Sequence, residues 1–193
     1  MKTGQDLIKT VQKIELFNFC GLGVRVVGHK YRQDSLGTTG ALKVGGRYNI
    51  PDYLPGAFGA LYLAGDIETA EIEAGATAAS NRWEKSYFLA MYKLLFVDLR
   101  QIEHLSKLGI TDELSCNWKL MNLEEAAVAP TQVLSWAFHK HTAVQGLIYS
   151  SNKNPSGYNL VIFPEKLSAG YYLKSRFFFY TPEEIGQDIP TSS

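Results

Sequence analysis

The sequence predicts an α+β fold: a single compact domain in which mixed or antiparallel β-sheets are flanked by helices. A length of 193 residues is typical of one domain. Hydrophobic residues make up 46% of the chain and charged residues 20%, which are the proportions of a globular protein. Segments with helical spacing are interspersed with short β-branched and aromatic runs, and no internal repeat is present.

In the first half of the chain, the elements surround a glycine-rich segment. Leu7 and Val11 lie at helical spacing, which predicts a short amphipathic helix in an N-terminal extension, residues 1–22. The remaining expectations are a strand over 24–32 that ends on a cationic cluster, a loop over 33–58, a buried strand over 59–64, and a helix after it that Asp66 caps.

The second half of the chain alternates apolar strands with two helices. We expect a central strand or hairpin over 85–100, a helix ending at Gly109, a helix over 130–142, and strands over 146–151, 158–163 and 168–180. Residues 111–125 show no decisive pattern. The main domain is predicted to span residues 23–180, and residues 181–193 form a polar C-terminal tail.

Composition argues against two kinds of partner. Nineteen basic residues balance nineteen acidic ones, so the basic surplus typical of direct nucleic-acid binding is missing. No window approaches the apolar length of a membrane span, and the N-terminus lacks the pattern of a signal peptide. Cys20 and Cys116 have no metal-ligand spacing and are expected to be intracellular thiols, with a disulfide between them as the alternative. We therefore expect a cytoplasmic protein without a membrane partner.

The familiar catalytic and cofactor motifs are missing from the sequence. It contains no GxGxxG, GxxxxGK[ST], GxSxG or HExxH, so Rossmann, P-loop, α/β-hydrolase and zincin chemistry lose their usual support. His139 and His141 are two residues apart, a spacing that directs them to different faces of a helix. We expect neither a metal site nor a bound cofactor.

Three places combine residue types that suit a binding site. Arg32 and Arg47 lie fifteen residues apart across the glycine-rich segment, and two guanidinium groups could clamp a diphosphate. Glu73 follows other glutamates on the helix that begins after Asp66 and is a candidate to point inward. GLIYSS, residues 146–151, is a strand ending in two hydroxyls. Each feature alone is more often structural than functional.

Taken in order along the chain, these pieces resemble a known family. YR at residues 31–32, GALKVGGRYN at 40–49, ALYLA with ETAEIE at 60–73, and GLIYSS with NLVIF at 146–163 resemble the motifs of the RES domain. The family takes its name from an arginine, a glutamate and a serine. The resemblance runs from about residue 24 to about residue 163, and Tyr48 stands where the family commonly has tryptophan.

The resemblance implies a set of site residues. Matching motif to motif implies catalytic roles for Arg32, Arg47, Glu73 and Ser151, and substrate binding by Arg32, Arg47, Tyr62 and Ser151. Glu71 competes with Glu73, and Ser150 with Ser151, if the register of either match is shifted. Both alternatives stay open at the level of sequence.

The resemblance also implies a fold and an activity. RES proteins are similar in fold to ADP-ribosyltransferases, and the family is known as toxins of bacterial toxin–antitoxin pairs that consume NAD⁺. The resemblance therefore implies NAD⁺ as substrate, cleavage of its nicotinamide–ribose bond, no cofactor, and an Xre-type helix-turn-helix antitoxin as partner. Water, phosphate or a protein side chain could be the acceptor, and a catalytically silent nucleotide-binding module is the alternative. The oligomeric state is open, with a homodimer as one arrangement.

Overall fold

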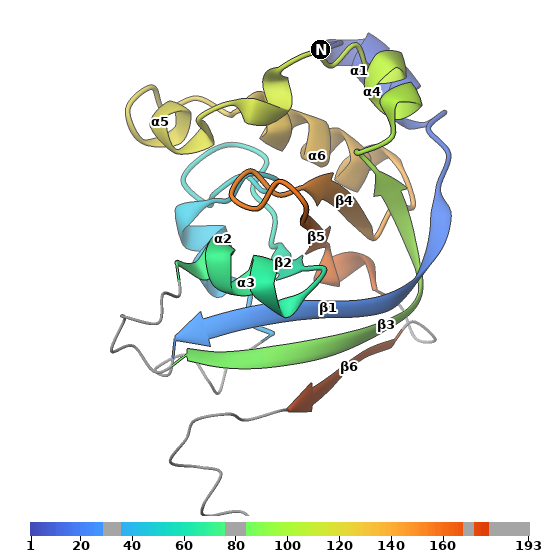
Figure 1. The fold of residues 1–193 in the computed structure, drawn as a ribbon. Helices are drawn as coiled ribbons and strands as arrows, with labels where there is room; N and C mark the ends of the chain where they lie inside the picture. The colour runs from blue at the N-terminus through green and yellow to red at the C-terminus, as the bar shows by residue number, and fades with distance from the viewer. Residues whose placement is uncertain (29–35, 76–83, 168–171, 178–193) are drawn as a thin grey trace, which may run out of the picture.

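A computed structural model describes residues 1–28, 36–75, 84–167 and 172–177 (Figure 1). The expected tail, 181–193, lies outside these ranges. The strands are β1 (Phe17–Gly28), β2 (Leu61–Ala64), β3 (Glu84–Asp98), β4 (Gly146–Ser150), β5 (Tyr158–Ile162) and β6 (Tyr172–Phe177). The α-helices are α1 (Gly4–Val11), α2 (Thr39–Val44), α3 (Ile67–Ala74), α4 (Ile102–Leu108), α5 (Trp118–Leu123) and α6 (Pro130–His141). The described ranges also contain the short 3₁₀ turns η2 (Glu113–Ser115) and η3 (Pro164–Lys166).

The described strands form one mixed sheet, which confirms the predicted α+β class. Their order is β1-β2-β5-β4-β3-β6, and β1 also pairs with β3, so five of the strands close into a ring of pairings. Within this described sheet, β3 and β4 run parallel, and the other paired strands are antiparallel. In the ring, β2 lies between β1 and β5. Helix α3 contacts the turn after β4, because Ser151 and Asn154 of that turn hydrogen-bond to Glu73 and Thr69 of the helix.

Two long strands give the sheet its curvature. β1 and β3 run together as curved ribbons, with the helices above them and β6 below (Figure 1). Their register shifts between Phe19 and Gly21, and Lys93 on β3 has a positive φ of 55°. Irregularities of this kind bend a strand and increase its twist. The bend allows β3 to pair with β6 over its first part and with β4 at Phe96–Asp98.

The principal core lies between the sheet and the helices α1, α4 and α6. Leu7 and Val11 of α1 pack there with Leu134 and Phe138 of α6 and with Phe163. A second cluster, which includes Leu89, Met91, Phe96, Leu160 and Ile162, fills the inside of the curved sheet. Since α1 is part of the principal core, and β1 begins at Phe17, the segment expected as an extension belongs to the fold.

Most elements expected from the sequence are present. The helices at the N-terminus, after Asp66, before Gly109 and over 130–142 are confirmed, and Gly109 ends α4 in the left-handed conformation with φ 64°. The described part of the 24–32 strand belongs to β1, which starts earlier. The expected loop over 33–58 is partly wrong, because it contains α2. Residues 111–125 form η2 and α5.

None of the helices in the described ranges combines the length and apolar composition needed to cross a bilayer.

Candidate active site

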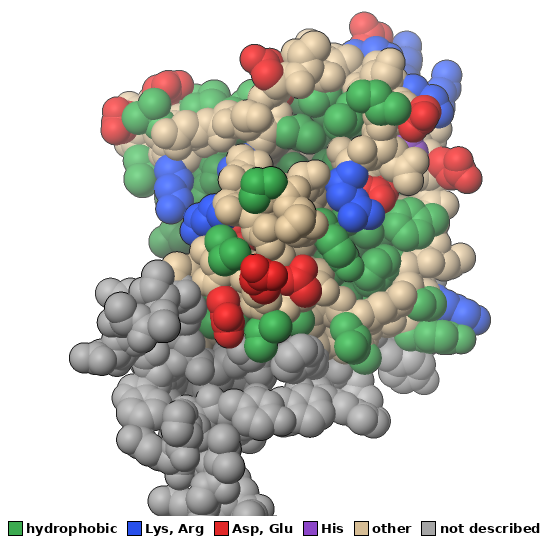
Figure 2. Space-filling model, viewed as in Figure 1, with side chains coloured by type: hydrophobic (Ala, Val, Ile, Leu, Met, Phe, Trp, Pro, Cys, Tyr) green, Lys and Arg blue, Asp and Glu red, His purple; other side chains and the backbone are tan. Residues whose placement is uncertain are grey.

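Helix α3 presents one of its glutamates to the interior of the molecule. Asp66 caps the helix, as predicted, by accepting a hydrogen bond of 2.7 Å from the backbone N–H of Thr69. Glu68 and Glu71 are exposed, whereas Glu73 is half-buried. Figure 2 shows acidic side chains gathered where α3 reaches the surface. Of the two glutamates that the sequence left as alternatives, Glu73 is therefore the one that enters the site.

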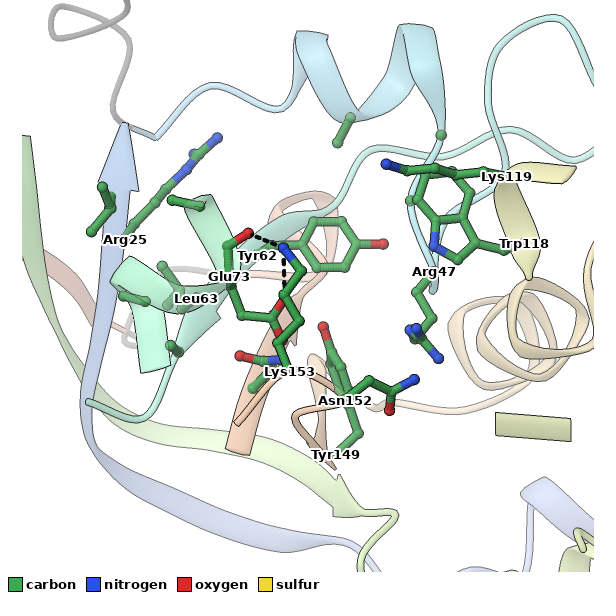
Figure 3. Close-up of a pocket in the computed structure, with 18 of the residues that line it drawn as sticks. Arg25, Arg47, Tyr62, Leu63, Glu73, Trp118, Lys119, Tyr149, Asn152 and Lys153 are labelled. Carbon is green, nitrogen blue, oxygen red and sulfur yellow. Dashed lines mark hydrogen bonds and ion pairs between the residues drawn. The ribbon is translucent and has the colours of Figure 1, made fainter. Parts of the chain in front are cut away.

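The carboxylate of Glu73 is held by two neutral donors. Ser151 Oγ and Asn159 Nδ2 each donate a hydrogen bond of 2.7 Å to the same oxygen, Oε1. Lys153 Nζ donates to the backbone carbonyl of Glu73 at 2.7 Å and lies 3.9 Å from Oε2 (Figure 3). This arrangement fixes one carboxylate oxygen and leaves the other with a looser ionic neighbour.

Ser151 occupies a tight turn behind that carboxylate. Its hydroxyl oxygen also accepts hydrogen bonds from the backbone N–H of Lys153, at 3.2 Å, and of Asn154, at 3.0 Å. The Asn154 side chain in turn donates to Thr69 Oγ1 on α3 at 2.9 Å. Ser151 is buried and Ser150 is exposed. The turn after β4 and helix α3 are thus tied to each other, and Ser151 is the serine that reaches Glu73.

Arg47 projects from a tight turn within GGRYN. Gly46 and Asn49 pair across the turn through two backbone hydrogen bonds of 3.2 and 3.4 Å, and Gly45 has a positive φ of 75°. The Arg47 guanidinium donates to the carbonyl of Leu114 in η2. The amide oxygen of Asn152, turned toward the guanidinium, accepts from Nη1 at 3.0 Å and from Nη2 at 2.9 Å.

Tyr62 supports the same turn. Its hydroxyl donates to Asn49 Oδ1 and accepts from the backbone N–H of Tyr48, both at 2.9 Å. A Cβ atom on Gly46 would lie 2.4 Å from the Tyr62 hydroxyl oxygen, so only glycine fits there. Burial raises the pKa of the Tyr62 hydroxyl well above its usual range, although the hydrogen bond from Tyr48 opposes the rise. Tyr62 therefore stays neutral at physiological pH.

A buried side-chain amide on α6 donates hydrogen bonds to the turn that carries Arg47. Gln132 is fully buried, and its Nε2 donates to the carbonyls of Gly46, at 2.9 Å, and Asn49, at 3.0 Å. Its Oε1 accepts from the Ala129 backbone N–H and from Asn122 Nδ2, both at 2.9 Å. Gln132 thereby links the turn that carries Arg47 to the segment around α5.

These residues surround a cleft of about 660 Å³. That volume lies within the range of small-molecule sites, about 300–1,000 Å³. Among the described lining residues, the cations Arg25, Arg47, Lys119 and Lys153 outnumber the single carboxylate, Glu73. Aromatic rings of Tyr62, Tyr149 and Trp118 form part of the wall (Figure 3). The cleft is locally cationic although the whole chain has a net charge of +0, and this favours an anionic ligand.

The structure brings most of the predicted site residues together. Arg47, Tyr62 and Glu73 line the cleft, and Ser151 stands behind Glu73 as its hydrogen-bond donor. Arg32 lies outside the described residues. In the described part of the chain, no group of three or more potential ligands among His, Cys, Asp and Glu is placed to hold a metal ion.

Several residues of the site were not predicted from the sequence, because the sequence pattern around each of them is weak. Trp118 and Lys119 belong to α5, which is six residues long and therefore shows no clear periodicity. Lys153 lies in the polar loop between two apolar strands. Asn159 is the one side-chain amide in the apolar strand YNLVI, and this position was the best available clue. A buried polar residue in such a strand needs a partner, and here the partner is Glu73.

Comparison with known proteins identifies the class of this chain. The RES domain family model matches residues 23–176, so the chain belongs to the RES domain family. A chain in the crystal structure of the M. tuberculosis MbcT–MbcA toxin–antitoxin complex has a similar fold, with a TM-score of 0.65 and 20% sequence identity. The match covers 91% of this chain and 93% of that chain. Comparison with curated protein sequences gives no significant match.

Proposed function

We propose that the protein consumes NAD⁺ by breaking the bond between nicotinamide and ribose, with the cleft as its active site. The observation that carries the proposal is the Glu73 carboxylate, fixed by Ser151 and Asn159 in the wall of a cationic cleft. Membership of the RES domain family supports the same activity, because the family is known for toxins that consume NAD⁺.

In this reaction the bonding electrons leave with nicotinamide, which departs as a neutral molecule. Positive charge then develops on the ribose carbon, as in glycoside hydrolysis. A carboxylate next to that carbon stabilises the charge and can accept hydrogen bonds from the ribose hydroxyls. Glu73 Oε1 is occupied by its two donors, so Oε2 is the oxygen we assign to the ribose.

The acceptor completes the reaction at the same ribose carbon. Attack by water gives ADP-ribose and a proton, attack by phosphate gives ADP-ribose phosphorylated on the reacting ribose carbon, and attack by a protein nucleophile gives an ADP-ribosylated target. We propose the first two for this chain, as a glycohydrolase or a phosphorylase, with protein modification as the alternative. Product analysis separates the three.

Arg47 is placed to bind the diphosphate that joins the two halves of NAD⁺. It lines the cleft with its guanidinium oriented by Leu114 and Asn152. A guanidinium fixed at two points can offer its remaining N–H groups to a phosphate without a large loss of side-chain entropy. Tyr62 is neutral and borders the same space, where its ring can pack against the nicotinamide or its ribose.

We propose further that the protein is the toxin of a bacterial toxin–antitoxin pair in the cytoplasm. This part rests on the family and on the similarity in fold to a chain of the MbcT–MbcA toxin–antitoxin complex. The partner would be a helix-turn-helix antitoxin of the Xre type. The test is first to look for a small helix-turn-helix protein encoded beside this one. Co-expression of the two proteins and purification of a stable complex then test this part separately from the enzymatic activity.

Release of nicotinamide from NAD⁺ by the purified protein tests the enzymatic proposal. Glu73→Gln keeps the size and hydrogen-bonding shape of the side chain but removes its charge, so we expect release to fall by about a hundredfold or more. Glu71→Gln is the matched control, because Glu71 is exposed on the same helix; it should leave the rate unchanged.

Two results would reject parts of this proposal. A folded wild-type protein that releases no nicotinamide, with or without phosphate, and yet binds NAD⁺ would be a silent nucleotide-binding module. Equal rates for wild type and Glu73→Gln would retain the enzyme and reject the role given to Glu73.

A further inference from the structure

One end of the cleft is built by α5 and carries an aromatic ring beside a cation. Trp118 is half-buried and lines the cleft, and Lys119 follows it at the exposed edge. Lys119 Nζ lies 5.6 Å from the centroid of the Trp118 ring, within reach of a cation–π interaction. Arg47 reaches into the same end of the cleft (Figure 3).

Several side-chain hydrogen bonds hold this end of the cleft in place, although α5 is short. The Asn117 side chain caps the helix by accepting from the backbone N–H of Leu120 at 3.3 Å. Asn122 is 2% exposed, and its Nδ2 donates to the Ala127 carbonyl at 2.7 Å and to Gln132 Oε1 at 2.9 Å. Gln132 also holds the turn that carries Arg47. One buried amide network therefore positions both Trp118 and Arg47.

The other end of the cleft has a different character. It is lined by small and branched apolar side chains of β1, β2 and α3, including Val24, Leu63 and Ala70. Arg25 also lies there and donates to the carbonyl of Gly37 at 3.1 Å. Glu73 stands between the two ends (Figure 3). The apolar end suits a small uncharged leaving group, and the α5 end suits a phosphate followed by a flat aromatic base.

We infer that the α5 end is the subsite for the adenosine half of the dinucleotide, with the adenine ring stacked on Trp118 and Lys119 paired with the diphosphate. The inference rests on the proposed function, which places the reacting ribose at Glu73. With the ribose there and the diphosphate at Arg47, the adenosine half extends toward α5. Trp118 and Lys119 then act as specificity-determining residues that distinguish a dinucleotide from a nicotinamide mononucleotide.

Stacking explains why a tryptophan suits this place. Every base offers a flat face, and stacking on an aromatic side chain contributes substantially to binding without reading the pattern of hydrogen bonds. A flanking ammonium strengthens binding because the phosphate charge is neutralised at the same time. Neither residue touches the ribose at Glu73 in this arrangement. Their loss should therefore affect binding and leave the chemical step intact.

Steady-state kinetics with two substrates tests the inference. Trp118→Ala should raise the KM for NAD⁺ by about tenfold or more, as loss of one stacked base implies, with kcat unchanged. Its kcat/KM for nicotinamide mononucleotide, which lacks the adenosine half, should equal that of wild type. Leu123→Ala, at an exposed position of the same helix, is the control and should behave as wild type with both substrates. An unchanged KM for NAD⁺, or equal losses with both substrates, would overturn the inference.

Direct binding separates this inference from the proposed activity. Calorimetry with AMP needs no turnover, and the Kd of Trp118→Ala for AMP should be about tenfold or more above that of wild type. Trp118→Phe, which keeps a ring, should recover most of the affinity. If wild type releases no nicotinamide but shows this pattern with AMP, the proposed activity fails and the subsite stands. If AMP binds Trp118→Ala as tightly as wild type, the subsite is rejected whatever the activity.

Discussion

The hydroxyl of Ser151 donates a 2.7 Å hydrogen bond to Glu73 Oε1, joining residues that are 78 positions apart in the sequence. The same hydroxyl accepts two backbone hydrogen bonds from the turn after β4. Its oxygen and its hydrogen are both occupied, so Ser151 orients the carboxylate rather than offering a free group to a ligand. We therefore propose that Ser151 is a positioning residue and that Asn159 shares this role from β5.

Removal of Ser151 should therefore impair catalysis through Glu73. In Ser151→Ala the carboxylate keeps its charge but loses one of two donors, and we expect kcat to fall by about tenfold to a hundredfold. Asn159→Ala should act similarly, and the two losses should not add, because both bonds restrain the same oxygen. A double-mutant cycle on kcat measures the coupling. Strictly additive losses would contradict a shared role.

Arg47→Lys should weaken substrate binding while the fold persists. A lysine carries the charge but cannot contact Leu114, Asn152 and a phosphate together as the guanidinium does. We expect KM for NAD⁺ to rise by about tenfold or more, with the melting temperature close to that of wild type. Lys43→Gln, at an exposed position of α2, serves as the control. A large fall in melting temperature with unchanged KM would instead make Arg47 a structural residue.

Gln132→Met should destabilise the protein and disturb the turn that carries Arg47. The substitution keeps the length of the side chain but strips hydrogen bonds from the buried carbonyl of Gly46, the Ala129 N–H and Asn122. We expect the free energy of unfolding to fall by at least about 2 kcal/mol, which lowers the melting temperature by about 4–8 °C. Differential scanning calorimetry measures this. Lys140→Gln, exposed on the same helix, should be neutral.

The Asp98–Arg100 pair predicts how stability depends on pH. Burial alone would raise the pKa of Asp98, but hydrogen bonds from Arg100, at 2.8 Å from Nε and 2.7 Å from Nη2, lower it overall. A carboxyl whose pKa is lower in the folded state stabilises the protein above its unfolded pKa, about 3.9, and loses this contribution as pH falls through the folded value.

Urea denaturation of wild type and Asp98→Asn over about pH 7 to 3 measures this contribution. We expect wild type to be more stable at neutral pH and the difference to shrink in acid. A difference independent of pH would show that Asp98 contributes by packing or neutral hydrogen bonding rather than by its charge.

Local sequence signals predicted much of the fold and part of the site. Asp66 before a helical pattern and Gly109 after one are chemical requirements of helix ends, and the structure uses both in this way. Glu73 and Ser151 were predicted through the resemblance to the RES domain, each with a neighbour as the alternative. The structure distinguishes each residue from its neighbour by burial, since Glu71 and Ser150 are exposed. Burial depends on the three-dimensional packing of α3 against the turn after β4.

The rest of the site required tertiary information. Helix α5 is too short for its spacing to be distinctive, so Trp118 and Lys119 had no local signal. Gln132 lies within an apolar helical pattern, where a glutamine usually faces solvent, and here it is fully buried because two backbone carbonyls of a distant turn need donors. The spacing of residues along the sequence cannot predict a hydrogen-bond partner that is more than eighty residues away.

The close approach of Gly46 to Tyr62 affects how the GGR motif should be interpreted in other members of the family. The Tyr62 hydroxyl, at 2.4 Å from where a Cβ would stand, already requires the absence of a side chain at this position. A relative that lacked Glu73 but kept this tyrosine in the same place would still need a glycine here for the turn to form. The glycine of the motif therefore indicates only that the turn is intact. A search for relatives without the proposed activity should examine Glu73 and its two hydrogen-bond donors instead.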